Sequence, residues 1–208
     1  TLSIAVYVLT GILPKSSKAS EASLKYLLLG AFSSGLFLYG AALLYGASGS
    51  LSLAGLAKHF QAGSLNTMGL IGMGLLLVGF CFKVAAVPFH MWTPDVYDGA
   101  PSPISGFMSV GVKAAAFAAF LRVFFECFGS AQVTWSQILW ILAVLTMILG
   151  NLAALVQSNI KRMLAYSSIA HAGYILVGMV AGTSKGAAGI LYDLLAYIFT
   201  NLGAFAVV

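Results

Sequence analysis

Long apolar runs separated by short polar turns dominate this chain. A helix that crosses a bilayer needs about 20 mostly apolar residues, and this length divides the sequence into seven apolar segments. Alternating ten-residue strands are absent from the sequence, so the backbone polar groups must be satisfied within helices. The pattern predicts an all-α integral membrane protein with a single membrane domain over residues 1–208. We expect helices at about residues 1–13, 21–47, 65–90, 104–128, 135–157, 163–181 and 186–208.

Composition supports a bilayer as the surroundings of the chain. Hydrophobic residues make up 61% of the sequence and charged residues only 7%, with a mean hydropathy of +1.00, whereas soluble domains carry about 25% charged residues. The net charge of +5 comes from few, scattered side chains and forms no basic patch, so we expect no nucleic-acid partner. Cys81 and Cys127 lie in separate apolar segments and predict neither a disulfide framework nor a thiolate metal site.

The positive-inside rule sorts the loops into two alternating sets. One set carries Lys58 and Lys185 only. The other set carries four lysine and arginine residues, and we expect it to face the cytoplasm or the equivalent compartment; it comprises residues 14–20, 91–103 and 158–162.

The most unusual stretch is residues 80–122, in which Lys83 and Lys113 interrupt apolar runs. A lysine at bilayer depth costs roughly 2.5–3.5 kcal/mol on insertion scales, so it usually faces a polar cavity and marks an ion pathway. Pro88 has no amide hydrogen and crowds the carbonyl of Val84, which predicts a helix broken near Pro88. Broken helices beside intramembrane charges are typical of transport sites. The alternatives are a lysine that extends to the interface and a proline kink without function.

Several titratable side chains extend this pattern into a candidate proton relay. His90 follows Lys83 by seven residues, and its imidazole titrates near pH 6.5, which suits proton transfer. Lys113 lies close to mid-membrane, where burial disfavours the charged form and would allow proton exchange near pH 7. We therefore predict that Lys83, Lys113 and His90 form a relay. His171, on a polar stripe of the sixth segment, either supports the proton path or only holds helices together, and Asp193 has no partner that the sequence identifies.

Further polar residues could support the relay. Glu21 and Lys25 form an i, i+4 pair in the favourable order, which either orients the second segment or tunes the intramembrane lysines. Asp95 lies in the polar turn WTPDVYDGAPSP, where it either caps a helix or marks a proton entrance. Trp92 and Tyr97 of the same turn predict anchors at the membrane interface. The three histidines lack the spacing of metal ligands, so we expect no metal site.

Two long motifs carry a family resemblance. They are FKVAAVPFHMWTPDVYDGAPSP and GNLAALVQSNIKRMLAYSSIAHAGY, with the Lys113 segment between them. Through these motifs the chain resembles the antiporter-like, proton-pumping membrane subunits of respiratory complex I. The turn WTPDVYDGAPSP is typical of the type called subunit N, the counterpart of mitochondrial subunit 2 and of the chloroplast B subunit.

The resemblance implies that this chain is the central fragment of a fold with roughly fourteen transmembrane helices, built from two inverted repeats that each contain a broken helix. Its residues match the family motifs at Lys83 (the broken-helix lysine), Lys113 (the lysine of the following helix), His90 (the histidine after the proline), and Glu21 and Lys25 (the start of helix six). The resemblance also places a glutamate that pairs with the broken-helix lysine before residue 1, and a second broken helix after residue 208.

The function that the resemblance implies is proton translocation by a subunit of NADH:quinone oxidoreductase, an enzyme subunit of the translocase class without redox chemistry of its own. NADH, FMN, iron–sulfur clusters and quinone would then bind in partner subunits, and the partners of this chain would be the other membrane subunits of complex I. The expected location is the bacterial inner membrane, with an organelle inner membrane or a thylakoid membrane as alternatives. Two other functions stay open: a subunit of a multi-subunit sodium/proton antiporter or membrane-bound hydrogenase, and a non-conducting membrane scaffold.

Overall fold

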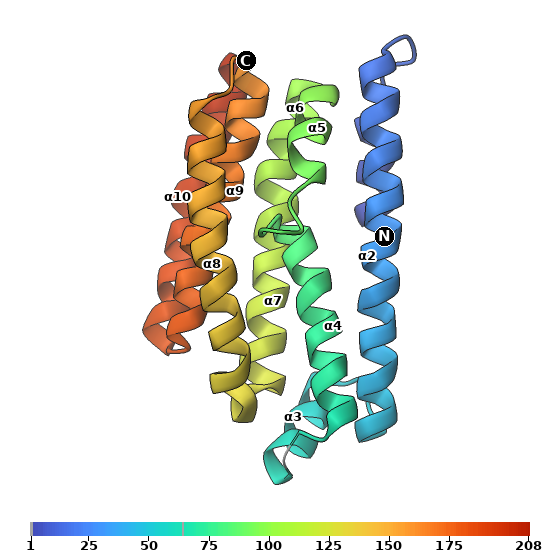
Figure 1. Ribbon diagram of the computed structural model, residues 1–208, viewed down its shortest axis with the longest axis vertical. Coiled ribbons are helices and arrows are strands. Elements are labelled where there is room, and N and C mark those ends of the chain that lie inside the picture. The colour runs from blue at the N-terminus through green and yellow to red at the C-terminus, as the bar shows by residue number, and fades with distance from the viewer. Residues whose placement is uncertain (1, 64) are drawn as a thin grey trace.

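The computed structural model describes residues 2–63 and 65–208, and every regular element of this part is a helix (Figure 1). Six helical segments of the described part are long and apolar enough to cross a membrane. This confirms the prediction of an all-α, multi-pass membrane fold. The six segments are Ser17–Ser48, Thr67–Val84, Ser102–Cys127, Gly129–Leu155, Ile160–Ala181 and Ser184–Val207.

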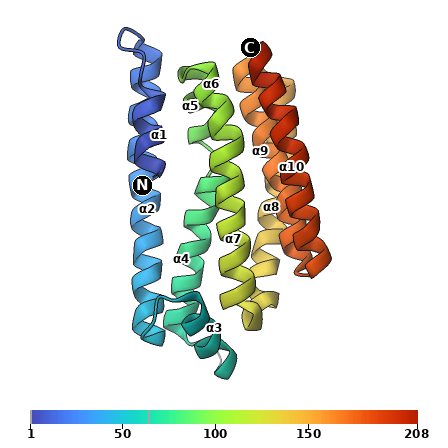
Figure 2. The same ribbon diagram turned by 180° about the vertical axis from the view of Figure 1, so that it is seen from behind.

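The long helices lie side by side along one axis, and shorter helices fill the ends and the middle (Figures 1 and 2). Helix α2 packs along α4, and α8 packs along α9. The short α1 is antiparallel to α2 and packs against its first half, whereas α3 lies at the opposite end (Figure 2). The helices are α1 (Leu2–Thr10), α2 (Ser17–Ser48), α3 (Leu53–Ala62), α4 (Thr67–Val84), α5 (Trp92–Gly99), α6 (Ser102–Phe107), η1 (Met108–Val112), α7 (Lys113–Cys127), η2 (Gly129–Ala131), α8 (Gln132–Leu155), α9 (Ile160–Ala181) and α10 (Ser184–Val207).

Polar capping residues extend two helices beyond their predicted starts. The side chain of Ser16 accepts a hydrogen bond from the amide of Ala19, at 3.2 Å, and so caps α2. The Asn159 Oδ1 accepts hydrogen bonds from the amides of Lys161 and Arg162 at the start of α9. These caps satisfy amides that the first turn of a helix leaves free. Hydropathy alone placed the starts later, because the first turns of both helices carry polar residues.

The predicted third helix, over residues 65–90, is shorter in the structure and broken. Helix α4 ends at Val84, and Ala85 adopts a left-handed conformation with φ of 62°. The chain then passes through turns and begins α5 at Trp92. The break near Pro88 was correctly predicted, but it starts three residues before the proline, where the left-handed residue stops the helical hydrogen bonds.

Helix α5 corrects two predictions about the turn WTPDVYDGAPSP. The first part of this stretch is helical, and Trp92 and Tyr97 are buried, with 4% and 0% of their surface exposed. Trp92 stacks on Tyr26 of α2, with ring centroids 4.5 Å apart. Neither aromatic residue is an interface anchor, because α5 folds back between α2 and α9 and takes both side chains into the core.

Close packing of α8 on α9 yields a prediction about stability. A Cβ atom at Gly150 would lie 2.6 Å from the backbone nitrogen of Ala170, whereas a Cβ atom at Gly35 of α2 would have no neighbour within 4 Å. Alanine favours helix over glycine by about 1 kcal/mol, but overpacking costs roughly 1–3 kcal/mol. We expect Gly150→Ala to lower the thermal unfolding midpoint of the full-length protein in detergent and Gly35→Ala to leave it unchanged or raise it. Equal midpoints for the two variants would contradict this account of the α8–α9 contact.

Candidate functional site

Lys83 lies in the last turn of α4, directly before the break, and its ammonium contacts α1. The Lys83 Nζ donates hydrogen bonds to Ser3 Oγ at 2.8 Å and to Tyr7 Oη at 3.5 Å. The side chain is half-buried and borders a cavity of about 470 Å³ between α2, α4 and the start of α7. Helix α1 also contributes to this cavity, whose other lining residues are Leu2, Ser3, Ser33, Ser34, Phe37, Leu38, Gly79, Phe80, Val112, Ala115 and Ala116.

Lys113 is 2% exposed and contacts α9 rather than α1. Its Nζ donates hydrogen bonds to the carbonyl oxygen of Ser168 at 2.7 Å and to Ser168 Oγ at 2.5 Å. The π-helical segment η1 ends directly before Lys113, and such wider turns change the direction of the side chains that follow them. Within the described residues, neither Lys83 nor Lys113 has a carboxylate within 4.0 Å of its nitrogen.

The broken helix satisfies its free backbone groups through side chains. The Trp92 Nε1 donates to the carbonyl oxygen of Phe82 at 3.0 Å, and the amide of Val87 donates to Thr146 Oγ1 of α8 at 2.9 Å. An unpaired backbone group in hydrocarbon costs several kcal/mol. Trp92 and Thr146 therefore make a stable break possible at this depth.

His90 lies in the turns between α4 and α5 and is half-buried. Burial lowers the pKa of its imidazole, and the nearby Pro88 backbone only partly opposes this effect. His90 is therefore neutral at pH 7. Among the described side chains, none forms a hydrogen bond with its buried Nδ1, and the structure shows no direct contact of His90 with Lys83 or Lys113.

A cluster of ion pairs joins three helices at one end of the bundle. Asp95, in the first turn of α5, accepts hydrogen bonds from Lys25 of α2 at 2.8 Å and from Arg162 of α9 at 2.7 Å. Lys25 is also 2.7 Å from Glu21, as the i, i+4 spacing predicted. Burial alone would raise the pKa of the Asp95 carboxyl, but the hydrogen bonds from Lys25 and Arg162 outweigh it and hold this pKa below its usual value. The structure thus places Glu21, Lys25 and Asp95 together, near the N-terminus of α2 and away from the contacts of Lys83.

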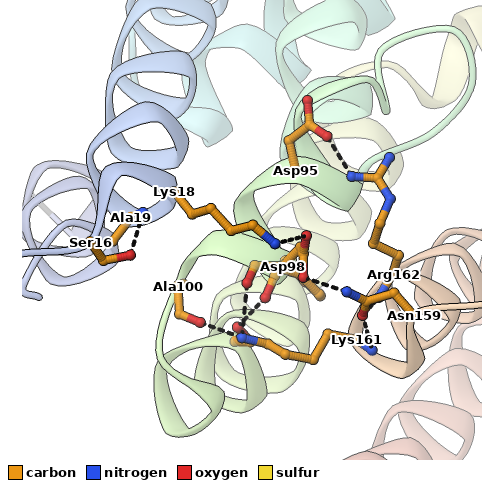
Figure 3. A network of polar contacts seen from close by, with 11 residues as sticks. Ser16, Lys18, Ala19, Asp95, Asp98, Ala100, Asn159, Lys161 and Arg162 are labelled. Atoms are coloured by element: carbon orange, nitrogen blue, oxygen red, sulfur yellow. Dashed lines mark hydrogen bonds and ion pairs between the residues drawn. The ribbon is translucent and has the colours of Figure 1, made fainter.

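A second cluster surrounds Asp98 at the same end (Figure 3). The Asn159 Nδ2 donates to Asp98 Oδ1 at 2.9 Å, and Lys18 lies 3.9 Å from Asp98 Oδ2. The Lys161 Nζ donates to the backbone carbonyl oxygens of Asp98 and Ala100, at 3.1 and 2.5 Å. These contacts bring together the three polar loops that the positive-inside rule assigned to one side of the membrane.

His171, in the middle of α9, faces an acid on the neighbouring helix. Its Nε2 lies 3.0 Å from Asp193 Oδ2 of α10, and its ring stacks on Tyr197 with centroids 4.1 Å apart. The distance is that of an ion pair, although the two groups are not aligned as a hydrogen bond, and neither atom has another hydrogen-bond partner among the described residues. His171 follows Ser168, the partner of Lys113, by one helical turn.

Sequence reasoning missed the partners of the predicted residues. Arg162 lies in a polar loop that the sequence used only to assign topology, and Ser168 lies on the polar stripe of the sixth segment, for which the sequence indicated no partner. Asp193 likewise had no partner that the sequence identified. The spacing of Ser168 and His171 places both on one face of α9, and this was the signal that could have linked them. No sequence pattern indicates that Asp193 and Lys113 both approach that face, because these contacts join segments far apart in the chain.

The charge cluster yields a prediction about the pH dependence of stability. Asp95 has a lowered pKa in the folded protein, so its ionised form stabilises the fold above the unfolded-state pKa of about 3.9, and this contribution is lost as the pH falls through the lower folded-state pKa. We expect Asp95→Asn to lower the thermal midpoint by roughly 2–4 °C at pH 7, and the difference from wild type to narrow below about pH 4.

Thermal unfolding of the full-length protein in detergent between pH 8 and pH 3 measures this effect. Glu126→Gln is the matched control, because Glu126 pairs with Arg122 on an exposed helix face, where ion pairs contribute little. A midpoint difference for Asp95→Asn that stays constant down to pH 3 would show that packing, not charge, causes the loss.

Comparison with known proteins agrees with this architecture. The family described as NADH:quinone oxidoreductase/Mrp antiporter, TM, matches residues 1–208. The NADH-quinone oxidoreductase subunit N of Trichlorobacter lovleyi is 58% identical over 209 residues, which cover 100% of this chain and 43% of that protein. The chain thus spans less than half the length of this relative.

Two solved structures contain a similar fold. A chain of respiratory complex I from Thermus thermophilus matches with a TM-score of 0.82 and 45% identity, over 99% of this chain and 43% of that one. A chain of the archaeal membrane-bound sulfane sulfur reductase matches with a TM-score of 0.88 and 35% identity, over 98% of this chain and 42% of that one. With a broken helix between Lys83 and the buried Lys113 and a family match over its whole length, the chain belongs to the NADH:quinone oxidoreductase/Mrp antiporter transmembrane family.

Proposed function

We propose that this chain is the central part of a proton-translocating subunit of NADH:quinone oxidoreductase, of the subunit N type. The observation that carries the proposal is Lys113, an almost fully buried lysine in a membrane-spanning segment that is held by a hydroxyl and a carbonyl group. A lysine in this setting marks an ion pathway. The similarity to subunit N of Trichlorobacter lovleyi supports the same function.

The proposed mechanism uses Lys83 and Lys113 as two sites that gain and lose a proton. Within the described residues, Ser3, Tyr7 and Ser168 supply neutral hydrogen-bond acceptors for the two ammonium groups, and these acceptors can hold each lysine in its charged form. A unit charge moved to about 10 Å from such a lysine changes its energy by about 1.7 kcal/mol at an effective dielectric constant of 20. This energy alters proton occupancy more than tenfold, so charge movements in partner subunits could drive uptake and release.

The remaining site residues have supporting roles in this proposal. His90, neutral at pH 7, can pass a proton beside the break created near Pro88. Glu21, Lys25 and Asp95 fix the position of α5 and place charge at one end of the pathway. His171 lies one turn from the Ser168 partner of Lys113 and extends the pathway toward α10.

The proposed surroundings follow from the same similarity. The partners are the other membrane subunits of complex I, which lie beside this subunit in the bacterial inner membrane. NADH, FMN, iron–sulfur clusters and quinone bind in other subunits, so this chain contributes the translocase part of the enzyme and holds no redox cofactor.

A second candidate function is proton or sodium movement in a different membrane complex. It is favoured by the close likeness to a chain of the archaeal sulfane sulfur reductase complex. Because a complex of a different kind contains a chain with a similar fold, the fold alone does not identify the ion that is carried or the electron acceptor.

Replacing Lys83 and Lys113 tests the proposed relay. We expect Lys83→Met and Lys113→Met, each in the assembled enzyme in sealed vesicles, to reduce proton uptake per quinone reduced at least tenfold, because methionine keeps the length of the side chain but binds no proton. The exposed Lys58→Met of α3 is the matched control and should leave uptake unchanged. If Lys83→Met and Lys113→Met both show wild-type proton uptake and quinone turnover, the relay is excluded.

Exchange of the cation in the same vesicles separates the two candidate functions. If the subunit moves protons, replacing sodium with potassium leaves proton uptake unchanged. Uptake that requires sodium would favour the antiporter function.

A further inference from the structure

Asp193 is an intramembrane acid that has no role in the relay of Lys83, Lys113 and His90. It is the tenth residue of the 24-residue α10, so it lies about 15 Å along the helix, near the middle of a hydrocarbon core of about 30 Å. An ionised acid at this depth costs roughly 2.5–3.5 kcal/mol on insertion scales unless a partner compensates it. The partner in the structure is His171 of α9, at 3.0 Å.

The pair is connected to Lys113 through α9. Ser168 binds Lys113 and lies one turn from His171 on the same helix face. On the other side of the imidazole, Tyr197 of α10 stacks on the ring and its hydroxyl accepts a hydrogen bond from Asn201. Helices α7, α9 and α10 thus place the base His171 and the acid Asp193 next to the hydrogen-bond partner of Lys113.

The charges around His171 favour a proton on either Lys113 or His171, but not on both. The carboxylate of Asp193 on α10, 3.0 Å from Nε2, favours a positive charge on the imidazole, whereas the ammonium of Lys113 on α7, which Ser168 holds one turn away, opposes it. Among the described residues, the aromatic titratable groups whose rings contact the imidazole are Tyr174 on α9 and Tyr197 on α10, and the sequence of α8 contains no charged residue. The imidazole therefore gains a proton most easily when Lys113 gives one up.

We propose that Asp193 is a positioning residue that orients His171 and stabilises its imidazolium form, so that His171 receives the proton that leaves Lys113. In this step the Lys113 ammonium becomes a neutral amine, the neutral imidazole becomes imidazolium, and the Ser168 hydroxyl or a water molecule passes the proton without net change. The inference rests on the proposed function of the chain. It adds Asp193 as the acid that determines when His171, the proton site after Lys113, is charged.

The test compares Asp193→Asn with Asp193→Glu in the assembled enzyme in vesicles. We expect Asp193→Asn to move the alkaline limb of the pH profile of proton uptake to lower pH by about one unit, since a neighbouring carboxylate favours the charged imidazole by that amount or more. At pH 8 uptake should fall about tenfold, and at pH 6 it should approach wild type. Asp193→Glu, which keeps the charge, should restore the wild-type profile.

Two further variants separate positioning from general damage. If Asp193 acts through His171, the double variant Asp193→Asn/His171→Gln should pump no worse than His171→Gln alone. Glu126→Gln is the control for loss of an acid outside the pathway, because Glu126 pairs with Arg122 on an exposed face. The amount of assembled enzyme is measured for each variant, and uptake is expressed per quinone reduced.

The outcomes distinguish this inference from the proposed function. If Lys113→Met abolishes uptake but Asp193→Asn leaves the pH profile unchanged, the role of Asp193 is overturned and the relay stands. A uniform loss at all pH values that Asp193→Glu does not rescue also overturns it, because that pattern indicates a structural role. If Lys113→Met pumps normally, the proposed function itself fails.

Discussion

The need to pair every backbone polar group inside a bilayer governs this structure. Helix α4 stops at Val84, well within the bundle, and such an end is tolerable only where side chains replace the lost helical hydrogen bonds. Trp92 donates to the Phe82 carbonyl, and Thr146 accepts from the Val87 amide. Since Trp92 also stacks on Tyr26, the groups that stabilise the break fix α5 against α2 as well.

The broken helix gives the two lysines different surroundings. Lys83 is at the end of the broken helix, where a cavity borders its side chain and hydroxyl groups from α1 accept hydrogen bonds from its ammonium group. Lys113 follows a π-helical segment that directs it toward α9, where one serine offers both a hydroxyl and a carbonyl oxygen. Neutral acceptors stabilise an ammonium less than a carboxylate would. Within the described residues, the acceptors of the two ammonium groups are hydroxyl and carbonyl oxygens.

Much of this fold could be predicted from the sequence, because bilayer length and hydropathy constrain helices strongly. The spans, the break near Pro88 and the grouping of the polar loops all follow from local patterns. The helix starts at Ser17 and Ile160 were placed too late, since capping by Ser16 and Asn159 extends helices into polar sequence.

The partners of the candidate site residues were not predictable in the same way. Trp92 was expected at the interface, yet it is buried, because its surroundings come from α2 and α4 rather than from its own turn. The Lys113–Ser168 and His171–Asp193 contacts join segments whose relative rotation depends on packing of the whole bundle. A single sequence contains no local signal for that rotation.

Helix α9 sets the spacing between the charged end of the bundle and the buried lysine. Arg162, which pairs with Asp95, and Ser168, which holds Lys113, are six residues apart on this helix, or about 9 Å along its axis. One helix therefore carries both the residue that pairs with the surface acid and the residue that holds the buried lysine. A shift of α9 along its own axis would disturb both contacts together.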